Sequence, residues 1–410
     1  MWSLLLFPAL VSSLSFPWTT PLISGKLDEL QCDVQTLSSM NDQLYLKLQE
    51  LKRRKFFTIF KVKLDGQCPF WAMDYFCEQA TCAVCECRED EVPAAWKETT
   101  NLASRMATYK GWNESEPAWI FEEEPDTYVN LLKNAEAFTG YQGQHIWKAI
   151  YNENCFGDNQ SELCSEERLF YQIVSGLHTN INCHISYNYV GETDASSLEE
   201  AMEQTYPNLT MFHSRVAIHP DRIRNFYIAF ALLIRATNKA VDWLNHFDYR
   251  TGETENDLAT TKLVQEVLNI TMRECLLPFN EVELFSQPSG PLLKEEIRRH
   301  FYNISRIMDC VGCEKCRLHG KVQIYGLGTA LRILFSDAPS IQRNELIVKP
   351  TQALINTLAK FSKAEKVMRR MKELEIEGEV IVSGLVLLVL IVYGAVAVKC
   401  WGWARSKPRS

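Results

Sequence analysis

The sequence feature that most constrains the fold is a cluster of three cysteines, Cys310, Cys313 and Cys316, each three residues from the next. In the first turn of a helix, a Cys-x-x-Cys pair places two sulfur atoms within reach of a disulfide bond, because residues three apart are neighbours on the helix surface. The helix N-terminus and nearby Lys315 and Arg317 also lower the pKa of a thiol there. Only one adjacent pair can bond at a time, so the third cysteine must pair elsewhere, stay free or bind a metal.

Three kinds of site are compatible with this cluster: a redox pair, a structural disulfide knot and a metal centre. An iron–sulfur site of the ferredoxin type needs a fourth cysteine soon after the third, and none follows Cys316 here. A zinc site would have to borrow His319 or a cysteine from the segment 68–87. The spacing therefore favours a redox pair or a structural knot over zinc, and leaves these first two open.

Cysteine usage and glycosylation motifs indicate an oxidising compartment. The chain has 410 residues, 14 cysteines and a net charge of -8, and this acidic balance argues against nucleic acid as a partner. Sequons for N-linked glycosylation are spread along the chain, at Asn113, Asn159, Asn208, Asn269 and Asn303. Together they predict a lumenal or extracellular body, provided that an entry signal exists.

The two ends of the chain supply such signals. Residues 1–15 are mostly apolar and end in small residues, which predicts a signal peptide, although no Lys or Arg precedes the apolar run. Residues 380–398 carry no charge over 19 positions, enough for a transmembrane helix of roughly 28 Å. We expect residues 351–379 to form a charged amphipathic stalk. The basic tail at residues 399–410 should stay cytoplasmic, which places the body in the lumen.

The body between these ends has a mainly helical pattern. Residues 68–87 carry clustered cysteines and few aliphatic runs, which predicts an irregular, disulfide-tied loop. Helical spacing of apolar residues recurs elsewhere, in Asp42–Lys55, Glu166–Asn182, Arg222–Phe247, Leu258–Leu277 and Leu292–Met308. We therefore predict a mainly α fold, with one helical lumenal domain at residues 30–350.

Several motifs together make this sequence resemble the endoplasmic reticulum oxidoreductins. The stretch Cys310-Val-Gly-Cys313-Glu-Lys-Cys316-Arg-Leu-His-Gly is similar to the motif of that family. Other similar stretches follow in the right order: Cys32-Asp-Val, Cys68-Pro-Phe-Trp71, Cys82-Ala-Val84, Phe138-Thr-Gly-Tyr141, Asn154-Cys-Phe156, Ser175-Gly-Leu-His178 and Arg222-Ile-Arg-Asn225 through Arg235-Ala236. The resemblance extends from Cys32 to about Phe335.

The resemblance implies a helical fold around FAD and a definite set of cysteine pairs. These are an inner redox pair Cys313–Cys316 beside the flavin, an outer shuttle pair Cys77–Cys82 on a mobile loop, and structural disulfides Cys68–Cys310 and Cys155–Cys164. The implied FAD contacts are Thr139, Trp147, Ser175, His178, Arg222 and Arg235. No metal is implied.

The residue types suit such a ligand. A Trp can stack on a flat ring, and Arg pairs with pyrophosphate. Ser175 and His178 are three apart, so on a helix they share a face. Arg222 and Arg235 are 13 apart, about 140° round an ideal helix, so their placement on one ligand depends on the resemblance alone.

The function implied is a thiol oxidase of the endoplasmic reticulum membrane. It would oxidise reduced protein disulfide isomerase through the outer and then the inner pair, pass the electrons to FAD, and reduce dioxygen to hydrogen peroxide, in support of oxidative protein folding. Two other classes fit the composition: a zinc-stabilised, non-catalytic membrane glycoprotein, and a receptor-like binding module whose disulfides only hold it together.

The sequence also departs from the family pattern. Ala137 stands where the family commonly has an arginine, so one cationic FAD contact is missing or comes from another residue. Cys32 lacks its usual partner, and the regulatory cysteine of animal members has no match between Val92 and Asn130. Cys85 is extra beside Cys87, and Cys183 and Cys275 are also unmatched. We therefore do not predict that this chain is regulated by internal disulfide switching of the kind found in animal members.

Overall fold

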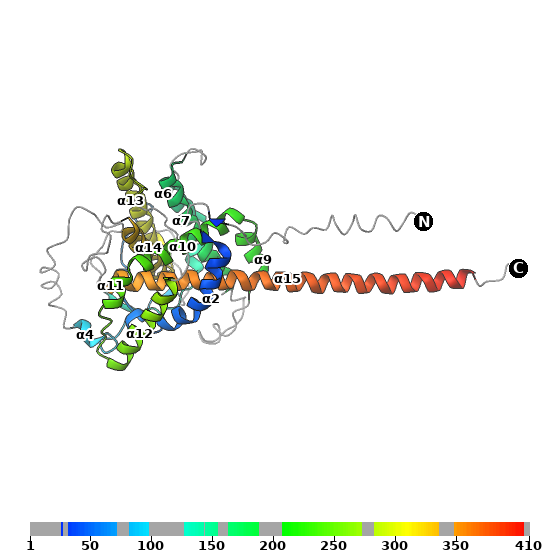
Figure 1. Ribbon diagram of the computed structural model, residues 1–410, viewed down its shortest axis with the longest axis horizontal. Coiled ribbons are helices and arrows are strands. Elements are labelled where there is room, and N and C mark those ends of the chain that lie inside the picture. Colours follow the sequence, from blue (N-terminus) through cyan, green and yellow to red (C-terminus); the bar gives the residue numbers. More distant parts are fainter. Residues whose placement is uncertain are drawn as a thin grey trace.

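The fold comes from a computed structural model, which describes residues 26–27, 32–71, 82–97, 127–142, 144–154, 163–187, 207–272, 283–335 and 348–405. The predicted signal peptide at residues 1–15 lies outside these residues, as do Cys77, Cys155 and Cys275. Figure 1 shows the arrangement of the described parts of the chain.

These parts are mainly helical, which confirms the predicted fold class. The helices of eight or more residues are α2 (Val34–Leu51), α6 (Gln144–Asn154), α7 (Ser165–Tyr187), α10 (Pro220–Lys239), α12 (Thr254–Thr271), α13 (Gly290–Ile307), α14 (Glu314–Leu334) and α15 (Val348–Arg405). Shorter helices are α3 (Lys55–Thr58), α4 (Ala94–Lys97), η4 (Thr139–Gln142), α9 (Leu209–Phe212), η6 (His213–Ala217), α11 (Val241–His246) and η7 (Met308–Cys310). The strands are β1 (Lys26–Leu27), β2 (Cys32–Asp33), β3 (Ile59–Val62) and β4 (Thr127–Asn130).

Helix α10 lies at the centre of the core, against α7 and α14. Pro220 begins it, Asp221 lies in its first turn and Lys239 in its last, so its ends complement the helix dipole. The run Phe226–Leu233 is buried without a break. Sequence patterning predicts one helix over Arg222–Phe247, whereas the structure ends α10 at Lys239 and begins α11 at Val241.

Two glycines allow close helix crossings. A Cβ atom at Gly176 of α7 would lie 2.5 Å from the backbone oxygen of Asn225 on α10. A Cβ atom at Gly326 of α14 would lie 2.1 Å from Thr357 Oγ1 and 2.4 Å from the backbone oxygen of Ala353 on α15. All three distances are too short for a Cβ atom, so these crossings require glycine.

The predicted stalk at residues 351–379 is wrong for most of its length. The first half of α15 packs against α14, α2 and α7 and belongs to the core. Leu354, Leu358, Phe361 and Met368 are all completely buried. The helical body therefore extends beyond the predicted boundary at residue 350, because the charged residues in this stretch have partners inside the body.

The second half of α15 leaves the body. Figure 1 shows this helix crossing the helical body and then protruding from it toward the C-terminus. The protruding part is long and apolar enough to cross a membrane, with a mean hydropathy of 2.8 over its most apolar window, none of which is buried. We infer a membrane span here from the length and the apolar composition of this part of the helix alone.

A small antiparallel ribbon of β3 and β4 lies beside the helices. Phe60 pairs with Val129 in its centre, and Glu86 forms a further bridge to Val129. The backbone amide of Cys87 also donates to the carbonyl of Tyr128, at 2.8 Å. The ribbon therefore anchors the cysteine-rich segment that follows Cys82.

Candidate active site

The cysteine cluster occupies the junction between η7 and α14. Cys310 ends η7, and Val311 has an extended backbone that breaks the helical path. Cys313 is the N-cap of α14, and its sulfur accepts a hydrogen bond from the amide of Cys316 at 3.4 Å. Cys313 and Cys316 are both buried and both free thiols. The predicted Cys-x-x-Cys pair in a helical first turn is therefore present.

The two thiols differ in acidity. Hydrogen bonding from the Cys316 thiol, then from Thr139 and from the amides of Cys316 and Lys315, lowers the pKa of Cys313 to about 6 despite burial. Burial, followed by the proximity of Cys313, raises the pKa of Cys316. Of the pair, Cys313 is thus the sulfur that carries negative charge near neutral pH.

Thr139 lies between the inner cysteines and the cysteine-rich segment. Its Oγ1 is 3.3 Å from Cys82 Sγ and 3.8 Å from Cys316 Sγ. The amide of Gly140 donates to Cys316 Sγ at 3.2 Å, and a Cβ atom at Gly140 would lie 2.9 Å from that of Cys316. Phe138, just before Thr139, has a φ of 61°, a conformation costly for a bulky residue and typical of functional turns. The strained turn brings one hydroxyl within reach of both cysteine systems.

Hydrogen bonds beyond Cys82 hold its segment against α14. Cys82 is disulfide-bonded, whereas its predicted partner Cys77 lies outside the described residues. The amide of Val84 donates to the Glu314 carboxylate at 2.8 Å, in the first turn of α14. The Asn134 side chain accepts from the amide of Cys85 at 2.7 Å and donates to its carbonyl at 2.8 Å. These contacts keep Cys82 beside the inner pair.

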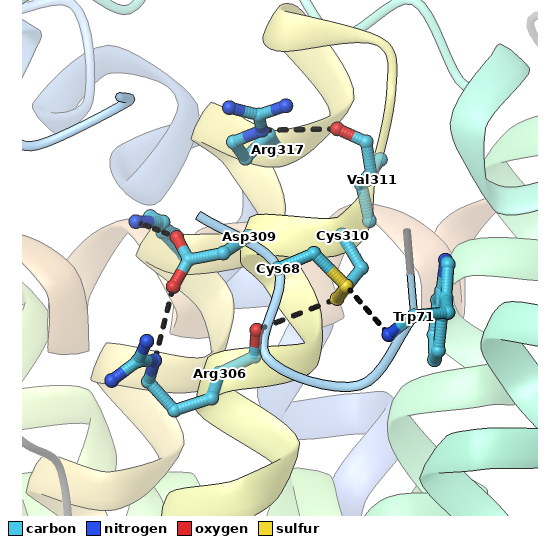
Figure 2. Close-up of a disulfide and its surroundings, with 8 residues drawn as sticks. Cys68, Trp71, Arg306, Asp309, Cys310, Val311 and Arg317 are labelled. Carbon is cyan, nitrogen blue, oxygen red and sulfur yellow. Dashed lines mark hydrogen bonds and ion pairs between the residues drawn. A yellow bond between two sulfur atoms is a disulfide. The ribbon is translucent and has the colours of Figure 1, made fainter. Parts of the chain in front are cut away.

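The predicted disulfide between Cys68 and Cys310 is present (Figure 2). It joins residues 242 positions apart, with Cα atoms 4.6 Å from each other. The amide of Trp71 donates to Cys68 Sγ at 3.4 Å, and Arg317 Nε donates to the carbonyl of Val311 at 3.0 Å. This disulfide accounts for the third cysteine of the cluster, because it occupies Cys310 and leaves Cys313 and Cys316 available to pair with one another.

The predicted Cys155–Cys164 disulfide is not formed. Cys155 lies outside the described residues, and Cys164 is a free thiol beside α7. Its amide donates to the Glu167 carboxylate at 3.1 Å, and burial together with this carboxylate and that of Glu166 raises the pKa of the thiol to about 11. In that setting Cys164 is a protonated, weakly nucleophilic thiol.

Three further described cysteines are free thiols: Cys85, Cys87 and Cys183. Burial raises the pKa of Cys87 and takes that of Cys183 well above its ordinary value. Within the part of the chain that the structure describes, no three His, Cys, Asp or Glu side chains gather closely enough to hold a metal ion.

Aromatic side chains of α6 and α7 form a flat surface near the turn at Thr139. The Trp147 and His178 rings stack with centroids 3.7 Å apart, and Tyr151 Oη lies 2.9 Å from His178 Nδ1. Trp147 Nε1 donates to the carbonyl of Tyr141 at 3.1 Å. Burial, then the positive charge of Arg222, lowers the pKa of His178 to about 3, so its imidazole is neutral.

Of the other predicted cofactor contacts, Ser175 and Arg222 lie near His178, whereas Arg235 does not. Ser175 Oγ accepts from Asn225 Nδ2 at 3.1 Å, which fixes it at the crossing of α7 and α10. Arg222 is near His178, whereas Arg235 lies almost four turns further along α10, roughly 20 Å away. Arg215 of η6 also faces His178, a cation that no sequence motif had indicated.

Sequence analysis also missed a buried polar cluster behind Cys316. Tyr141 Oη donates to the carbonyl of Cys316 at 2.5 Å, and burial together with Glu136 raises the pKa of this phenol. Lys360 of α15 forms an ion pair with Glu136, whose side chain is buried. Lys360 Nζ also lies 4.8 Å from the centre of the Phe138 ring. A cation therefore lies between the neighbours of Ala137, the position for which the family resemblance implies an arginine.

The described sequons lie in helical surroundings. Asn208 caps α9 by accepting from the amide of Met211 at 2.8 Å, and Asn269 is exposed on α12. Asn303 of α13 donates to the Glu153 carboxylate at 2.9 Å. Asn113 and Asn159 lie outside the described residues. Glycosylation of all of them stays a prediction.

Comparison with known proteins identifies the family. The family model described as Endoplasmic Reticulum Oxidoreductin 1 (ERO1) matches residues 43–368. The chain belongs to the ERO1 family. Its matched region reaches well into α15, in agreement with the burial of that helix and against a stalk beginning at residue 351.

Similar ERO1 proteins occur in plants, animals and yeast. The chain is 39% identical over 381 residues to endoplasmic reticulum oxidoreductin-2 of Arabidopsis thaliana, covering 85% of this chain and 78% of that protein. It is 35% identical over 386 residues to ERO1-like protein alpha of Bos taurus, covering 77% and 81%. A mutant of S. cerevisiae Ero1p has a similar fold, with a TM-score of 0.63, 25% identity, and coverage of 87% and 99%. The chain is accordingly an oxidoreductase of thiols, as predicted.

Proposed function

We propose that this chain oxidises protein dithiols in the endoplasmic reticulum by a relay from an outer disulfide, through an inner cysteine pair, to FAD and dioxygen. The observation that carries the proposal is the position of Thr139, whose hydroxyl lies between disulfide-bonded Cys82 and the inner sulfur of Cys316. A relay needs its two cysteine systems close enough to exchange, and this turn brings them together.

The first exchange would occur at the outer disulfide, for which we propose Cys77 as the partner of Cys82. A thiolate of reduced protein disulfide isomerase attacks one sulfur and forms a mixed disulfide. The second thiolate of the isomerase then resolves it. The products are an oxidised isomerase and an outer dithiol, so two electrons and two protons have moved to the outer pair.

The second exchange would pass these electrons to the inner pair. An outer thiolate attacks the Cys313–Cys316 disulfide, and a second attack leaves the outer pair oxidised and the inner pair reduced. The Thr139 hydroxyl and the amides at the start of α14 stabilise the Cys313 thiolate that results. At the same time, the Gly140 amide donates a hydrogen bond to Cys316 Sγ.

The residues around α6, α7 and α10 suit FAD as the acceptor of this relay. The stacked Trp147–His178 pair offers an aromatic face, the imidazole is neutral, and Arg222 and Arg215 offer cations for a pyrophosphate. When bound here, FAD would supply a two-electron acceptor for the inner dithiol and the route from it to dioxygen, which would be reduced to hydrogen peroxide. The family resemblance and this donor set support the assignment.

Location in the endoplasmic reticulum membrane belongs to the same proposal. A span at residues 380–398 would leave the body in the lumen and the basic tail at 399–410 in the cytoplasm. The exposed apolar half of α15 supports this topology, as do the cysteine content and the sequons. A signal peptide at residues 1–15 would provide entry.

The test compares single cysteine variants with two reductants in an oxygen electrode, after flavin absorbance has shown that each variant holds FAD. Cys316→Ser should abolish oxygen consumption with reduced protein disulfide isomerase and with dithiothreitol. Cys82→Ser should lose activity toward the isomerase and keep some toward dithiothreitol, because a small dithiol can reach the inner pair directly. Cys183→Ser, a buried thiol outside the relay, is the matched control.

Two results would reject the proposal. If the purified protein had no flavin spectrum, the chain would instead fit the alternative class of non-catalytic, disulfide-bonded glycoproteins. Full activity of Cys82→Ser toward the isomerase would break the relay, and would make Cys85 or Cys87 the shuttle candidates.

A further inference from the structure

A cavity lies beside η7, the short helix that ends at Cys310. It has a volume of about 60 Å³ and forms where β3, the end of α13, η7, α14 and the start of α15 meet. The residues that matter for its chemistry are Lys63, Arg306, Lys321, Lys349 and Asp309. None of them belongs to the proposed relay or to the proposed cofactor contacts.

The charged side chains that line this cavity are mostly positive, whereas the chain as a whole carries a net negative charge. Four cations and one carboxylate line it, an excess of three positive charges in a chain of net charge -8. Asp309 is buried and pairs with Arg306 Nε at 3.3 Å and with Lys321, as Figure 2 shows for Arg306. Because four of the lining side chains are cations and one is a carboxylate, the composition of the cavity lining favours an anion.

The surrounding groups reinforce this preference. Helix α15 begins at Val348, so its positive dipole end lies at the cavity beside Lys349. Lys349 Nζ is held 4.7 Å from the centre of the Tyr325 ring, and that ring and Phe60 form the apolar wall. Lys321 Nζ donates to the carbonyl of Lys63 at 2.7 Å, which joins α14 to the end of β3. The cations are therefore held in place by the fold.

We propose that this cavity binds a tetrahedral oxyanion, a phosphate group carried either by free phosphate or by a small phosphate monoester. The volume is enough for about four to six water-sized groups at roughly 10–15 Å³ each, so one tetrahedral oxyanion can be accommodated. A membrane lipid is the wrong source, because Lys349 and Val380 are 31 residues apart on one helix, roughly 46 Å. The bound group would tie α13, α14 and α15 together next to the Cys310 disulfide.

The experiment measures binding of inorganic phosphate to the flavin-loaded full-length protein in detergent. Equilibrium dialysis with labelled phosphate, at constant ionic strength adjusted with chloride, should give saturable binding of one phosphate per chain. Phosphate should also raise the Tm by a few degrees relative to chloride. The double variant Lys63→Gln/Lys349→Gln should weaken binding at least tenfold and abolish the Tm increase.

The matched control is Lys133→Gln/Lys262→Gln, which removes the same charge from exposed positions outside the cavity. It should bind phosphate like the unaltered protein. If the double variant fails to fold, Lys63→Gln alone replaces it, because only the backbone carbonyl of Lys63 is engaged by Lys321.

Displacement of phosphate by adenosine monophosphate would assign the site to a monoester, and failure to displace it would assign the site to free phosphate. Absence of saturable binding would overturn the proposal, as would equal weakening in the cavity variant and the control. Since FAD is bound throughout, neither result depends on the cofactor site or on the relay.

Discussion

Replacing Thr139 by Val tests how the proposed relay controls the charge of its inner pair. Valine is β-branched like threonine and carries a methyl group in place of the hydroxyl, which lies near Cys82 and Cys316 and also stabilises the Cys313 thiolate. Thr139→Ser keeps the hydroxyl and is the matched control.

The size of the effect follows from the hydrogen bond that is lost. A hydrogen bond to a charged group contributes about 1.5–3 kcal/mol, or roughly 1–2 pKa units at 1.36 kcal/mol each. The Thr139 hydroxyl stabilises the charged form, so its removal raises the pKa of Cys313 from about 6 to between about 7 and 8. At pH 7 the thiolate fraction then falls from about nine-tenths to between about one-half and one-tenth.

Alkylation kinetics measure this shift directly. The reduced protein is treated with iodoacetamide between pH 5 and 9 (a range chosen to bracket about 6 to 8), and modification of Cys313 is followed by mass spectrometry. The midpoint of the rate should move upward in Thr139→Val and stay in Thr139→Ser. An unmoved midpoint in Thr139→Val would show that the hydroxyl does not stabilise the thiolate, whatever happens to activity.

Three further predictions concern the cofactor, the core and the membrane. Arg222→Ala should lower flavin retention about tenfold or more, because Arg222 lies beside His178 and a charge-assisted contact contributes roughly 1.5–3 kcal/mol. Spectrophotometry of dialysed protein checks this, and Arg224→Ala, an exposed position on the same helix, should have no effect. Gly326→Ala should lower the free energy of unfolding by about 1–3 kcal/mol in a denaturant titration, whereas Gly378→Ala, with nothing within 4 Å of its Cβ position, should not. Protease added to intact microsomes should remove a C-terminal tag and leave the body intact; loss of the body would invert the proposed topology.

Local patterns were sufficient to predict the helical body and the form of the cysteine site. Helices α7, α12 and α13 begin within four residues of their predicted starts, because the spacing of apolar residues and the end signals are local properties. The position of Cys313 and Cys316 at the first turn of α14 likewise agrees with their three-residue spacing. The Cys68–Cys310 pairing could not follow from spacing across 242 residues, and it came from the family resemblance.

The nature of α15 could not be predicted because its charges are neutralised by distant residues. Asn41 Nδ2 donates to the carboxylate of Glu365 at 2.5 Å, although 324 residues separate them. Lys360 pairs with Glu136, and Lys366 pairs with Asp42. A charged amphipathic pattern is typical of an exposed helix, and nothing in the sequence near residues 351–371 shows that partners exist.

The same distant pairing explains why the group behind Cys316 was missed. Tyr141 belongs to a motif matched by the family resemblance, but its hydrogen bond to the carbonyl of Cys316 needs the tertiary fold. Lys360 looked like a stalk residue, and the structure places it against Glu136 and the Phe138 ring. Burial, with Lys360 and Lys363 close by, lowers the pKa of Lys52 to about 7. The sequence signal that did exist was Ala137, which left room for a cation from elsewhere.

The continuity of α15 has a mechanical consequence for the proposed membrane protein. The helix is unbroken from Val348 to Arg405, its first half is part of the core, and its second half is the proposed span. A flexible linker would let the body turn freely, but a helix that is rigid on this scale and packed against α14 fixes the body relative to the bilayer. Since α14 also carries the inner cysteines, the span and the redox pair are held by two helices in direct contact. The orientation of the outer disulfide toward its protein substrate would then be set by the membrane as well as by the fold.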